Sequence, residues 1–558
     1  MTVAEQQGGQ PGQVPQGQPP QERSSRLSLQ DLQPGESSQP REGVRGGWLA
    51  GKLAVVRRHW PAAVLLAAGL VLRVLAELAY RPALFYIDTT RYLYNADGMD
   101  PVGYKGPLRA ILLVGNFDAV AAVQHLLALA MAVVLYLLVL RRSGSRWLAA
   151  LAIAPLLLDA YQIQTEQSIM PGTWFEALIV AGLAILLWQQ RPGWRRVVLA
   201  GVVLGTSATF AQVGEVLVIP AVLYLLVAGA RGGAGSLAAA DAGADPEADS
   251  AAVTAAGGRA GGWWRRAGGK AAALVVAFAL PILAYSTGSY LMTGDFFLSH
   301  SGVTSFYGRM AAAADCTTLR LSAGERGMCP APAQQAMGPD WLEYGPGSPI
   351  RPYYAHLPRA TTDRLISDFN RRVLTQQPLR VAGAYSRDVL KPFALTRDTG
   401  PGDAPISRWQ FQTSFPYYPP HASTQVVRTA VAQFGGGAPA VWQPVARFLR
   451  AYQLDGGYTP GPLLLVFTVA GLAGSLALLR RRTRADPVAS QPALACLLFF
   501  GCGVALLLAS DLFEFSWRYQ LLALITLTPA GVLGIGVILS RLRQPPATGS
   551  SPVQQIQE

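Results

Sequence analysis

The chain has 558 residues, of which 51% are hydrophobic and only 14% are charged, and its formal net charge is +13. Soluble globular proteins carry roughly 25% charged residues, so this composition excludes an ordinary soluble enzyme, and repeated apolar runs of membrane-spanning length indicate a polytopic membrane protein instead. The arginines gather at one end of successive apolar runs, as the positive-inside rule expects, so the basic charge reports topology and gives no reason to expect a nucleic-acid partner.

The N-terminal residues 1–47 are rich in Gln, Pro, Gly and Ser and lack aliphatic periodicity, which predicts a disordered cytoplasmic tail. The first apolar span, at about 61–79, opens a membrane portion that covers residues 48–291. Arg57 and Arg58 precede this span and place its start inside and the following loop outside. Arg73 and Glu77 lie four residues apart within it. We expect them either to form an internal ion pair or to add the positive potential of Arg73 to an outer site.

The first outer loop, residues 80–117, is unusually rich in ionisable side chains among Tyr, Gly and Pro. Its charged members are Asp88, Arg91, Asp97, Asp100, Lys105 and Arg109. Ionisable groups at a membrane surface must be solvated, paired with an opposite charge, or involved in binding or catalysis. Asp88 is the leading catalytic candidate in this loop, and the alternative is a turn residue that caps a helix beginning at TTRYLYN.

Six further apolar runs complete the first membrane portion, at about 120–140, 147–158, 174–188, 197–210, 216–228 and 271–291. The loop at 159–173 contains Asp159 and Glu166 but no Lys or Arg, so it belongs outside. A Gly/Ala-rich stretch at 230–270 is typical of a flexible inner linker.

Residues 292–460 contain no membrane-length apolar run and are rich in Pro and Tyr, which predicts one extracytoplasmic soluble domain of mixed fold. Oxidation is allowed outside the membrane, so we expect a Cys316–Cys329 disulfide there, the alternative being two unrelated loop thiols. Residues 461–543 hold three further spans, at about 462–479, 493–509 and 521–539, before a short tail at 544–558.

Ten spans with both termini in the cytoplasm satisfy every arginine cluster. The predicted fold class is therefore an all-α polytopic plasma-membrane protein with about ten transmembrane helices and a mixed extracytoplasmic domain. Within it, three outer loops collect the ionisable residues, and the last of them, 510–520, carries Glu514 and Arg518. Carboxylates beside an arginine suit a lipid-linked phosphate, which the arginine would hold while a carboxylate deprotonates an incoming hydroxyl. No Walker or dinucleotide motif is present in the sequence.

The first outer loop also resembles a known one. An acid a few residues past the first span, followed by PVGYKGPL at 101–108, is similar to the first outer loop of GT-C fold glycosyltransferases. The resemblance is greatest to the polyprenyl-phosphate-dependent group related to protein mannosyltransferases and the lipid A aminoarabinose transferase. The family's Pro-Gly-Tyr-Pro-like turn is matched in part, by Pro101, Gly103, Tyr104 and Lys105, with Pro107 displaced.

The resemblance implies roles for particular residues. It makes Asp88 the catalytic base and Glu166 a second acid that orients the acceptor or a metal. It makes Arg518 and Tyr519 ligands of the donor phosphate. The remaining substrate-binding candidates are Arg91, Lys105 and Tyr104. Some relatives use a divalent cation, and these carboxylates could hold Mg²⁺ or Mn²⁺, although no ligand spacing demands it.

The sequence therefore predicts a GT-C type glycosyltransferase that moves a sugar from a polyprenyl-phosphate donor to a glycan, lipid or protein acceptor of the cell envelope. A transporter or flippase of a lipid-linked or small solute is the alternative, and it predicts charged residues buried within spans or broken helices. A non-catalytic scaffold is a third. The abundance of Ala, Arg and Gly is typical of an actinobacterial source.

Overall fold

A computed structural model describes residues 57–94, 101–241, 249–480, 483 and 487–542. Residues His59–Glu558 form one compact unit, distinct from Met1–Arg58. The two predicted tails, 1–47 and 544–558, lie outside the described residues.

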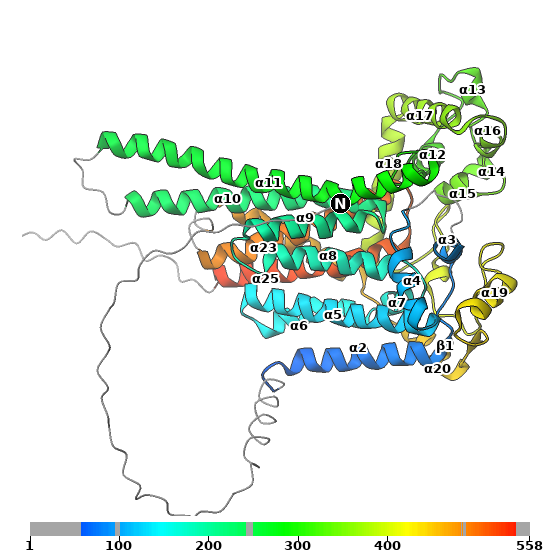
Figure 1. Ribbon diagram of the computed structural model, residues 1–558, viewed down its shortest axis with the longest axis horizontal. Coiled ribbons are helices and arrows are strands. Elements are labelled where there is room, and N and C mark those ends of the chain that lie inside the picture. The colour runs from blue at the N-terminus through cyan, green and yellow to red at the C-terminus, as the bar shows by residue number, and fades with distance from the viewer. Residues whose placement is uncertain (1–56, 95–100, 242–248, 481–482, 484–486, 543–558) are drawn as a thin grey trace, which may run out of the picture. The chain divides into compact units, whose positions relative to one another are not determined.

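Long apolar helices that run beside one another make up most of this unit (Figure 1). These helices are α2 (Trp60–Ala79), α5 (Phe117–Ser143), α6 (Arg146–Leu158), α8 (Gly172–Leu187), α9 (Trp194–Ala208), α10 (Val218–Asp241), α11 (Asp249–Thr293), α21 (Gly461–Leu476), α23 (Pro487–Asp511) and α25 (Leu527–Leu542). Short elements extend several of them: α7 (Ala160–Glu166), η1 (Gln212–Leu217), η4 (Ala477–Leu479), η5 (Trp517–Gln520) and α24 (Leu521–Ile525).

The prediction of a multi-pass helical membrane protein is confirmed, but the count of ten spans is not. Among the described residues, six helical segments are long and apolar enough to cross a membrane, or eight if two bent pairs each count as one span. The bends measure 58° between α6 and α7 and 41° between α24 and α25. Every predicted span is helical, yet α8 and α9 have only 16 and 15 residues, whereas an untilted span needs about 20.

Local sequence signals fix several helix ends. The Asn116 side chain accepts a hydrogen bond from the Ala119 amide and starts α5, and Gly144 ends it with a φ of 68°, a conformation that favours glycine. Asp159 separates α6 from α7 and caps α7 through the Tyr161 amide. This cap is the structural alternative to a catalytic Asp159.

Shorter elements gather at one end of the long helices, which we call the loop end (Figure 1). The first loop contributes β1 (Tyr80–Arg81), α3 (Thr89–Tyr94) and α4 (Lys105–Val114). The predicted soluble domain contributes α12 (Ser301–Ala313), α13 (Ala323–Arg326), α14 (Pro332–Gln335), α15 (Gly338–Tyr344), α16 (Arg351–His356), α17 (Arg359–Gln376), α18 (Pro378–Leu390), η2 (Lys391–Phe393), η3 (Ile406–Trp409), α19 (Thr424–Phe434), β2 (Ala440–Val441) and α20 (Gln443–Leu454).

The mixed fold expected for residues 292–460 is not what the structure shows. Its described elements are helical apart from β2, which pairs antiparallel with β1 through Tyr80 opposite Val441 and Arg81 opposite Ala440. Pro and Gly interrupt the helices without creating strands, because proline removes a hydrogen-bond donor and fixes φ in either context. The flexible linker expected at 230–270 is also helical where it is described, as the ends of α10 and α11.

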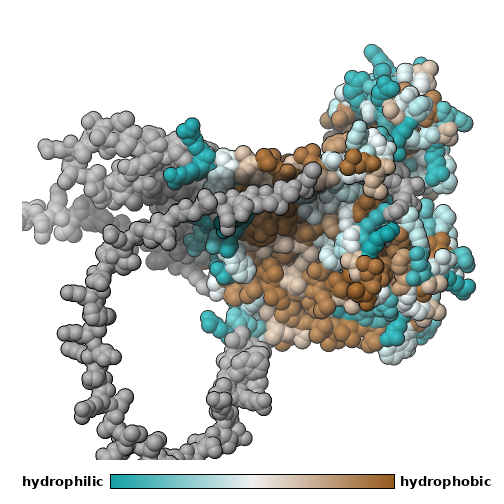
Figure 2. Space-filling model, viewed as in Figure 1, coloured by the Kyte–Doolittle hydropathy of each residue, from teal (hydrophilic) through white to brown (hydrophobic). Residues whose placement is uncertain are grey.

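Three buried clusters hold this unit together. The largest joins the long helices, a second fills the soluble domain around Tyr307, Leu342 and Phe369, and a third lies under the first loop and the last spans. Cys316 and Cys329 form a disulfide beside the second cluster, with Cα atoms 6.1 Å apart. On the face that Figure 2 shows, apolar side chains cover the long helices, whereas hydrophilic and apolar side chains are mixed at the loop end.

Candidate functional site

The candidate site lies where the first loop meets the short segment before the last span. We call its members, Asp88, Arg91, Glu514, Arg518 and Tyr519, the arginine–carboxylate cluster. Asp88 Oδ2 lies 3.9 Å from Arg518 Nη1, and Asp88 Oδ1 lies 3.6 Å from Arg91 Nη1. The side chains of Asp88 and Arg518 are 23% and 28% exposed, so both can meet a ligand while remaining partly desolvated.

A short turn fixes the position of Asp88. The Tyr86 amide donates to Thr89 Oγ1 at 2.8 Å, and that hydroxyl donates to the Ile169 carbonyl at 3.1 Å. The Leu84 amide donates to the Gln167 carbonyl, and the Ile169 amide donates to the Leu84 carbonyl. The loop that carries Asp88 is therefore tied to the chain that follows α7.

Arg518 is held by aromatic and hydroxyl groups as well as by Asp88. Its Nη2 donates to Tyr519 Oη at 3.2 Å, and Tyr519 Oη donates to Glu514 Oε1 at 3.1 Å. Its guanidinium carbon lies 5.3 Å from the centre of the Trp409 ring, which packs in turn against Tyr86 with ring centres 4.6 Å apart. Stacking and hydrogen bonding together orient the planar guanidinium.

A second carboxylate of this cluster titrates near neutral pH. Burial, reinforced by the nearby Asp340 carboxylate, raises the pKa of Glu514 to about 7, against the opposing effect of Arg518. The negative charge that faces Arg518 therefore changes across the neutral range.

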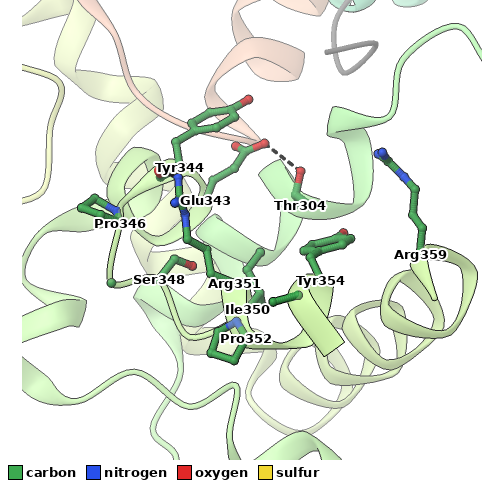
Figure 3. Close-up of a pocket in the computed structure, with 12 residues that line it drawn as sticks. Thr304, Glu343, Tyr344, Pro346, Ser348, Ile350, Arg351, Pro352, Tyr354 and Arg359 are labelled. Atoms are coloured by element: carbon green, nitrogen blue, oxygen red, sulfur yellow. Dashed lines mark hydrogen bonds between the residues drawn. The ribbon is translucent and has the colours of Figure 1, made fainter. Parts of the chain in front are cut away.

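A cavity of about 730 Å³ adjoins the cluster on the side of the soluble domain (Figure 3). Tyr344 lines it, and the Arg91 guanidinium carbon lies 5.7 Å from the centre of the Tyr344 ring. Glu343 also lines the cavity and accepts hydrogen bonds from the Thr304 and Ser305 hydroxyls at 2.8 and 2.6 Å. Burial raises the pKa of Glu343 to about 8, so this carboxyl is mostly protonated at neutral pH.

The structure brings together four of the predicted site residues. Asp88, Arg91, Arg518 and Tyr519 lie in one cluster although they come from opposite ends of the chain. Arg518 pairs with Asp88 of the first loop.

Glu166 lies outside this cluster. Its side chain is fully buried, and Arg73 Nη2 and Nε donate to its two carboxylate oxygens at 2.7 and 2.8 Å. His125 Nδ1 lies 2.9 Å from Glu166 Oε2. These contacts favour a structural role for the carboxylate, and its role in catalysis stays a prediction. The expected Arg73–Glu77 pair is replaced by this Arg73–Glu166 pair.

Tyr104 and Lys105 also lie outside the cluster. Tyr104 is fully buried, and its hydroxyl donates to Gln124 Oε1 at 2.9 Å, which favours a structural role in the first loop. Its role in substrate binding stays a prediction. Lys105 begins α4, where burial and the neighbouring Arg109 lower its pKa. Its role in substrate binding stays a prediction.

Three residues of the site went unpredicted: Trp409, Glu343 and Tyr344. They come from the long soluble domain, whose sequence carries no recognisable motif. Glu514 was noted beside Arg518 among the ionisable residues of the last outer loop, without a role of its own.

The residues do not fit a divalent metal centre. Among the described residues, no group of three or more His, Cys, Asp or Glu side chains converges as metal ligands. The carboxylates of the cluster are instead paired with cations, as Asp88 is with Arg91 and Arg518. No chemical step is therefore assigned to Mg²⁺ or Mn²⁺.

Comparison with known proteins does not identify a family for this chain. No protein-family model and no curated protein matches the chain. Among solved structures, the chain is similar to the archaeal oligosaccharyltransferase AglB from Archaeoglobus fulgidus, in complex with an inhibitory peptide and a dolichol-phosphate. The identity is 11%, the TM-score is 0.33, and the match covers 87% of this chain and 51% of AglB. The chain thus spans about half the length of AglB, and a TM-score this low does not place it in that enzyme's family.

Proposed function

We propose that the protein is a membrane glycosyltransferase that moves a sugar from a polyprenyl-phosphate donor to an acceptor on the extracytoplasmic face of the plasma membrane. The observation that carries this proposal is the meeting of Asp88 and Arg518 beside a cavity, at the ends of membrane helices. A partly exposed carboxylate next to an oriented guanidinium provides a base and a phosphate ligand at the same place.

The proposed reaction is a single displacement at the anomeric carbon. The acceptor oxygen forms the new glycosidic bond while the bond from the anomeric carbon to the phosphate oxygen breaks, and the configuration inverts. Asp88 takes the proton of the acceptor hydroxyl, and polyprenyl phosphate leaves with the electron pair. Arg518 stabilises the negative charge on the departing phosphate, with Tyr519 fixing the guanidinium.

Without substrates, Asp88 and Arg518 attract each other. When substrates bind, Arg518 contacts the donor phosphate and Asp88 contacts the acceptor hydroxyl. The donor phosphate takes over hydrogen bonds of Arg518, because an arginine fork binds a phosphate in a two-point geometry. Asp88 retains Arg91 as its other cationic neighbour at 3.6 Å.

A transporter or flippase is the second candidate, because two observations favour it. Two spans are bent pairs, and Arg73, His125 and Glu166 form a buried ionic network among the helices. Broken helices and buried charges are features of transporters. We rank the transferase first because the network is closed on itself, whereas the partly exposed cluster at the loop end is open to a ligand.

Turnover by the purified protein in lipid nanodiscs tests the proposal. A panel of polyprenyl-phosphate sugars would be offered with membrane extract as the source of acceptor, and released polyprenyl phosphate would be followed by mass spectrometry. Release with one donor supports the transferase and identifies the sugar. No release with any donor, together with movement of a labelled lipid across a vesicle membrane, would replace it with the transporter.

A further inference from the structure

The cavity beside the cluster is a second feature whose chemistry points to a ligand. It lies among α12, α15, α16 and the start of α17, and its volume of about 730 Å³ falls within the range of small-molecule sites. One lining residue, Ile350, is 2% exposed and belongs to the buried cluster of the soluble domain. The Cys316–Cys329 disulfide packs against the same buried cluster.

Two adjacent lining residues of the cavity also interact with members of the arginine–carboxylate cluster. Tyr344 lines the cavity and also lies under the Arg91 guanidinium, at 5.7 Å. Glu343 lines the cavity, and its carboxyl interacts electrostatically with Glu514. A molecule in the cavity therefore contacts Tyr344, whose ring lies against Arg91, and Arg91 in turn contacts Asp88.

The lining combines flat aromatic rings with polar groups of several kinds. Tyr344 and Tyr354 provide the rings, and the Tyr354 hydroxyl donates to Asp363 at 2.6 Å, which fixes its orientation. Arg351, labelled in Figure 3, supplies guanidinium donors. Its Nη2 donates to the Tyr344 carbonyl at 3.1 Å. Glu343 is protonated at neutral pH and so offers both a donor and an acceptor.

This combination matches a sugar better than a lipid or a peptide. A pyranose or furanose ring has an apolar C–H face that packs on an aromatic ring, and hydroxyls at its edge that both donate and accept. A lipid tail makes no use of hydrogen-bonding groups such as those of Glu343 and Arg351. An extended peptide would need an unpaired strand edge, which helices α15 and α16 around this cavity do not provide.

We propose that this cavity binds a saccharide unit of the acceptor, with Tyr344 and Tyr354 as ring platforms and Glu343 and Arg351 as hydrogen-bonding partners of its hydroxyls. The assignment of that saccharide as an acceptor rests on the proposed transferase function, whereas its binding does not. The acceptor class is thereby narrowed from glycan, lipid or protein to a glycan.

Binding without a donor tests the cavity separately from the reaction. The full chain in lipid nanodiscs would be applied to an array of neutral and acidic oligosaccharides and to an array of unmodified peptides. Arg351→Ala and Tyr354→Ala remove one hydrogen-bonding group and one platform. Arg364→Ala is the matched control, because Arg364 is exposed on α17 and does not line the cavity. Thermal unfolding of each variant confirms that it is folded.

We expect the wild type and Arg364→Ala to bind the same oligosaccharides, and Arg351→Ala and Tyr354→Ala to bind them about tenfold more weakly. Oligosaccharide binding in the absence of any donor turnover would support the cavity while removing the transferase function. Donor turnover without oligosaccharide binding, binding of peptides only, or unchanged binding by folded Arg351→Ala and Tyr354→Ala would overturn the cavity proposal.

Discussion

At the scale of single residues, Arg518 is the group on which the site depends. It pairs with Asp88, donates to Tyr519 and lies over the Trp409 ring. A lysine keeps the charge but has neither the planar fork nor the stacking surface. Arg518→Lys should therefore raise the KM for the polyprenyl-phosphate donor about tenfold while leaving the protein folded.

Steady-state kinetics with varied donor measures this effect. Arg447→Lys is the matched control, because Arg447 is exposed on α20 and bonds only Gln443 among the contacts described. An unchanged donor KM in Arg518→Lys would remove Arg518 from phosphate binding.

Glu514 gives the site a pH dependence. Burial raises its pKa to about 7, so it is neutral below that pH and negative above it. Its negative charge competes with the donor phosphate for Arg518, whereas a sugar phosphodiester keeps one charge throughout this range. The donor KM should therefore rise between pH 6 and pH 8.

Glu514→Gln provides the test, because its neutral amide should make the donor KM flat across the same range. A pH-dependent KM that persists in Glu514→Gln would assign the titration to another group.

The raised pKa of Glu514 also affects the stability of the fold. The pKa of this carboxyl is about 7 in the folded protein, against an ordinary value of 4.5, so the folded state binds the proton more tightly than the unfolded state does. The contribution of Glu514 to the free energy of unfolding therefore falls as the pH rises from 4.5 to about 7.

At the scale of elements, the buried network around Glu166 supports the loop that carries Asp88. Arg73 on α2 and His125 on α5 bind Glu166 at the end of α7, and the chain just after α7 pairs with Leu84 and Thr89. Removing one partner of a buried ion pair leaves the other uncompensated, at a cost of about 3–5 kcal/mol. Glu166→Ala should therefore lower the thermal midpoint strongly and reduce the yield of folded protein.

The matched control is Glu215→Ala, which removes an exposed carboxylate on η1 and should leave the midpoint unchanged. Comparing the thermal midpoint of Glu166→Ala with its turnover distinguishes a structural role from a catalytic one. A Glu166→Ala protein with the wild-type midpoint but no turnover would return Glu166 to the catalytic role that the sequence resemblance implied.

The disulfide is a second feature that stabilises the elements of the soluble domain. Cys316 and Cys329 are 13 residues apart in sequence, and closing a loop of this length stabilises a domain by about 3 kcal/mol through the entropy of its unfolded state. The double variant Cys316→Ser/Cys329→Ser should lower the stability of the soluble domain by about that amount. Limited proteolysis at increasing urea concentration measures it, with Cys502→Ser as the control for loss of a buried thiol. Equal protease resistance would show that the bridge contributes nothing.

At the scale of the whole molecule, the apolar runs predicted the helices well. Each predicted span is helical because about 20 apolar residues in a membrane have few alternatives to an internally bonded helix. The number of membrane spans was predicted less well, since α8 and α9 are short and two spans are bent. The helical character of residues 292–460 could not be read from their many prolines, because proline is compatible with helix starts as well as with turns.

The site was predicted only in part, for a physical reason. Asp88 and Arg518 stood out because charged groups next to apolar spans are costly unless used. The burial of Glu166 and Tyr104 could not be foreseen, because polar side chains in a loop look the same in sequence whether they face solvent or a partner on another helix. Glu343 and Tyr344 needed the folded soluble domain to bring them to Arg91.

The most direct test of the central claim is donor turnover by Asp88→Asn in lipid nanodiscs. The substitution keeps the size of the side chain and removes the base. Asp455→Asn, an exposed site on the loop after α20, serves as the control. With folding checked by thermal unfolding, we predict that release of polyprenyl phosphate falls by at least about 10²-fold in Asp88→Asn and is unchanged in Asp455→Asn. Wild-type turnover by folded Asp88→Asn would contradict the account, because the reaction would then use a different base.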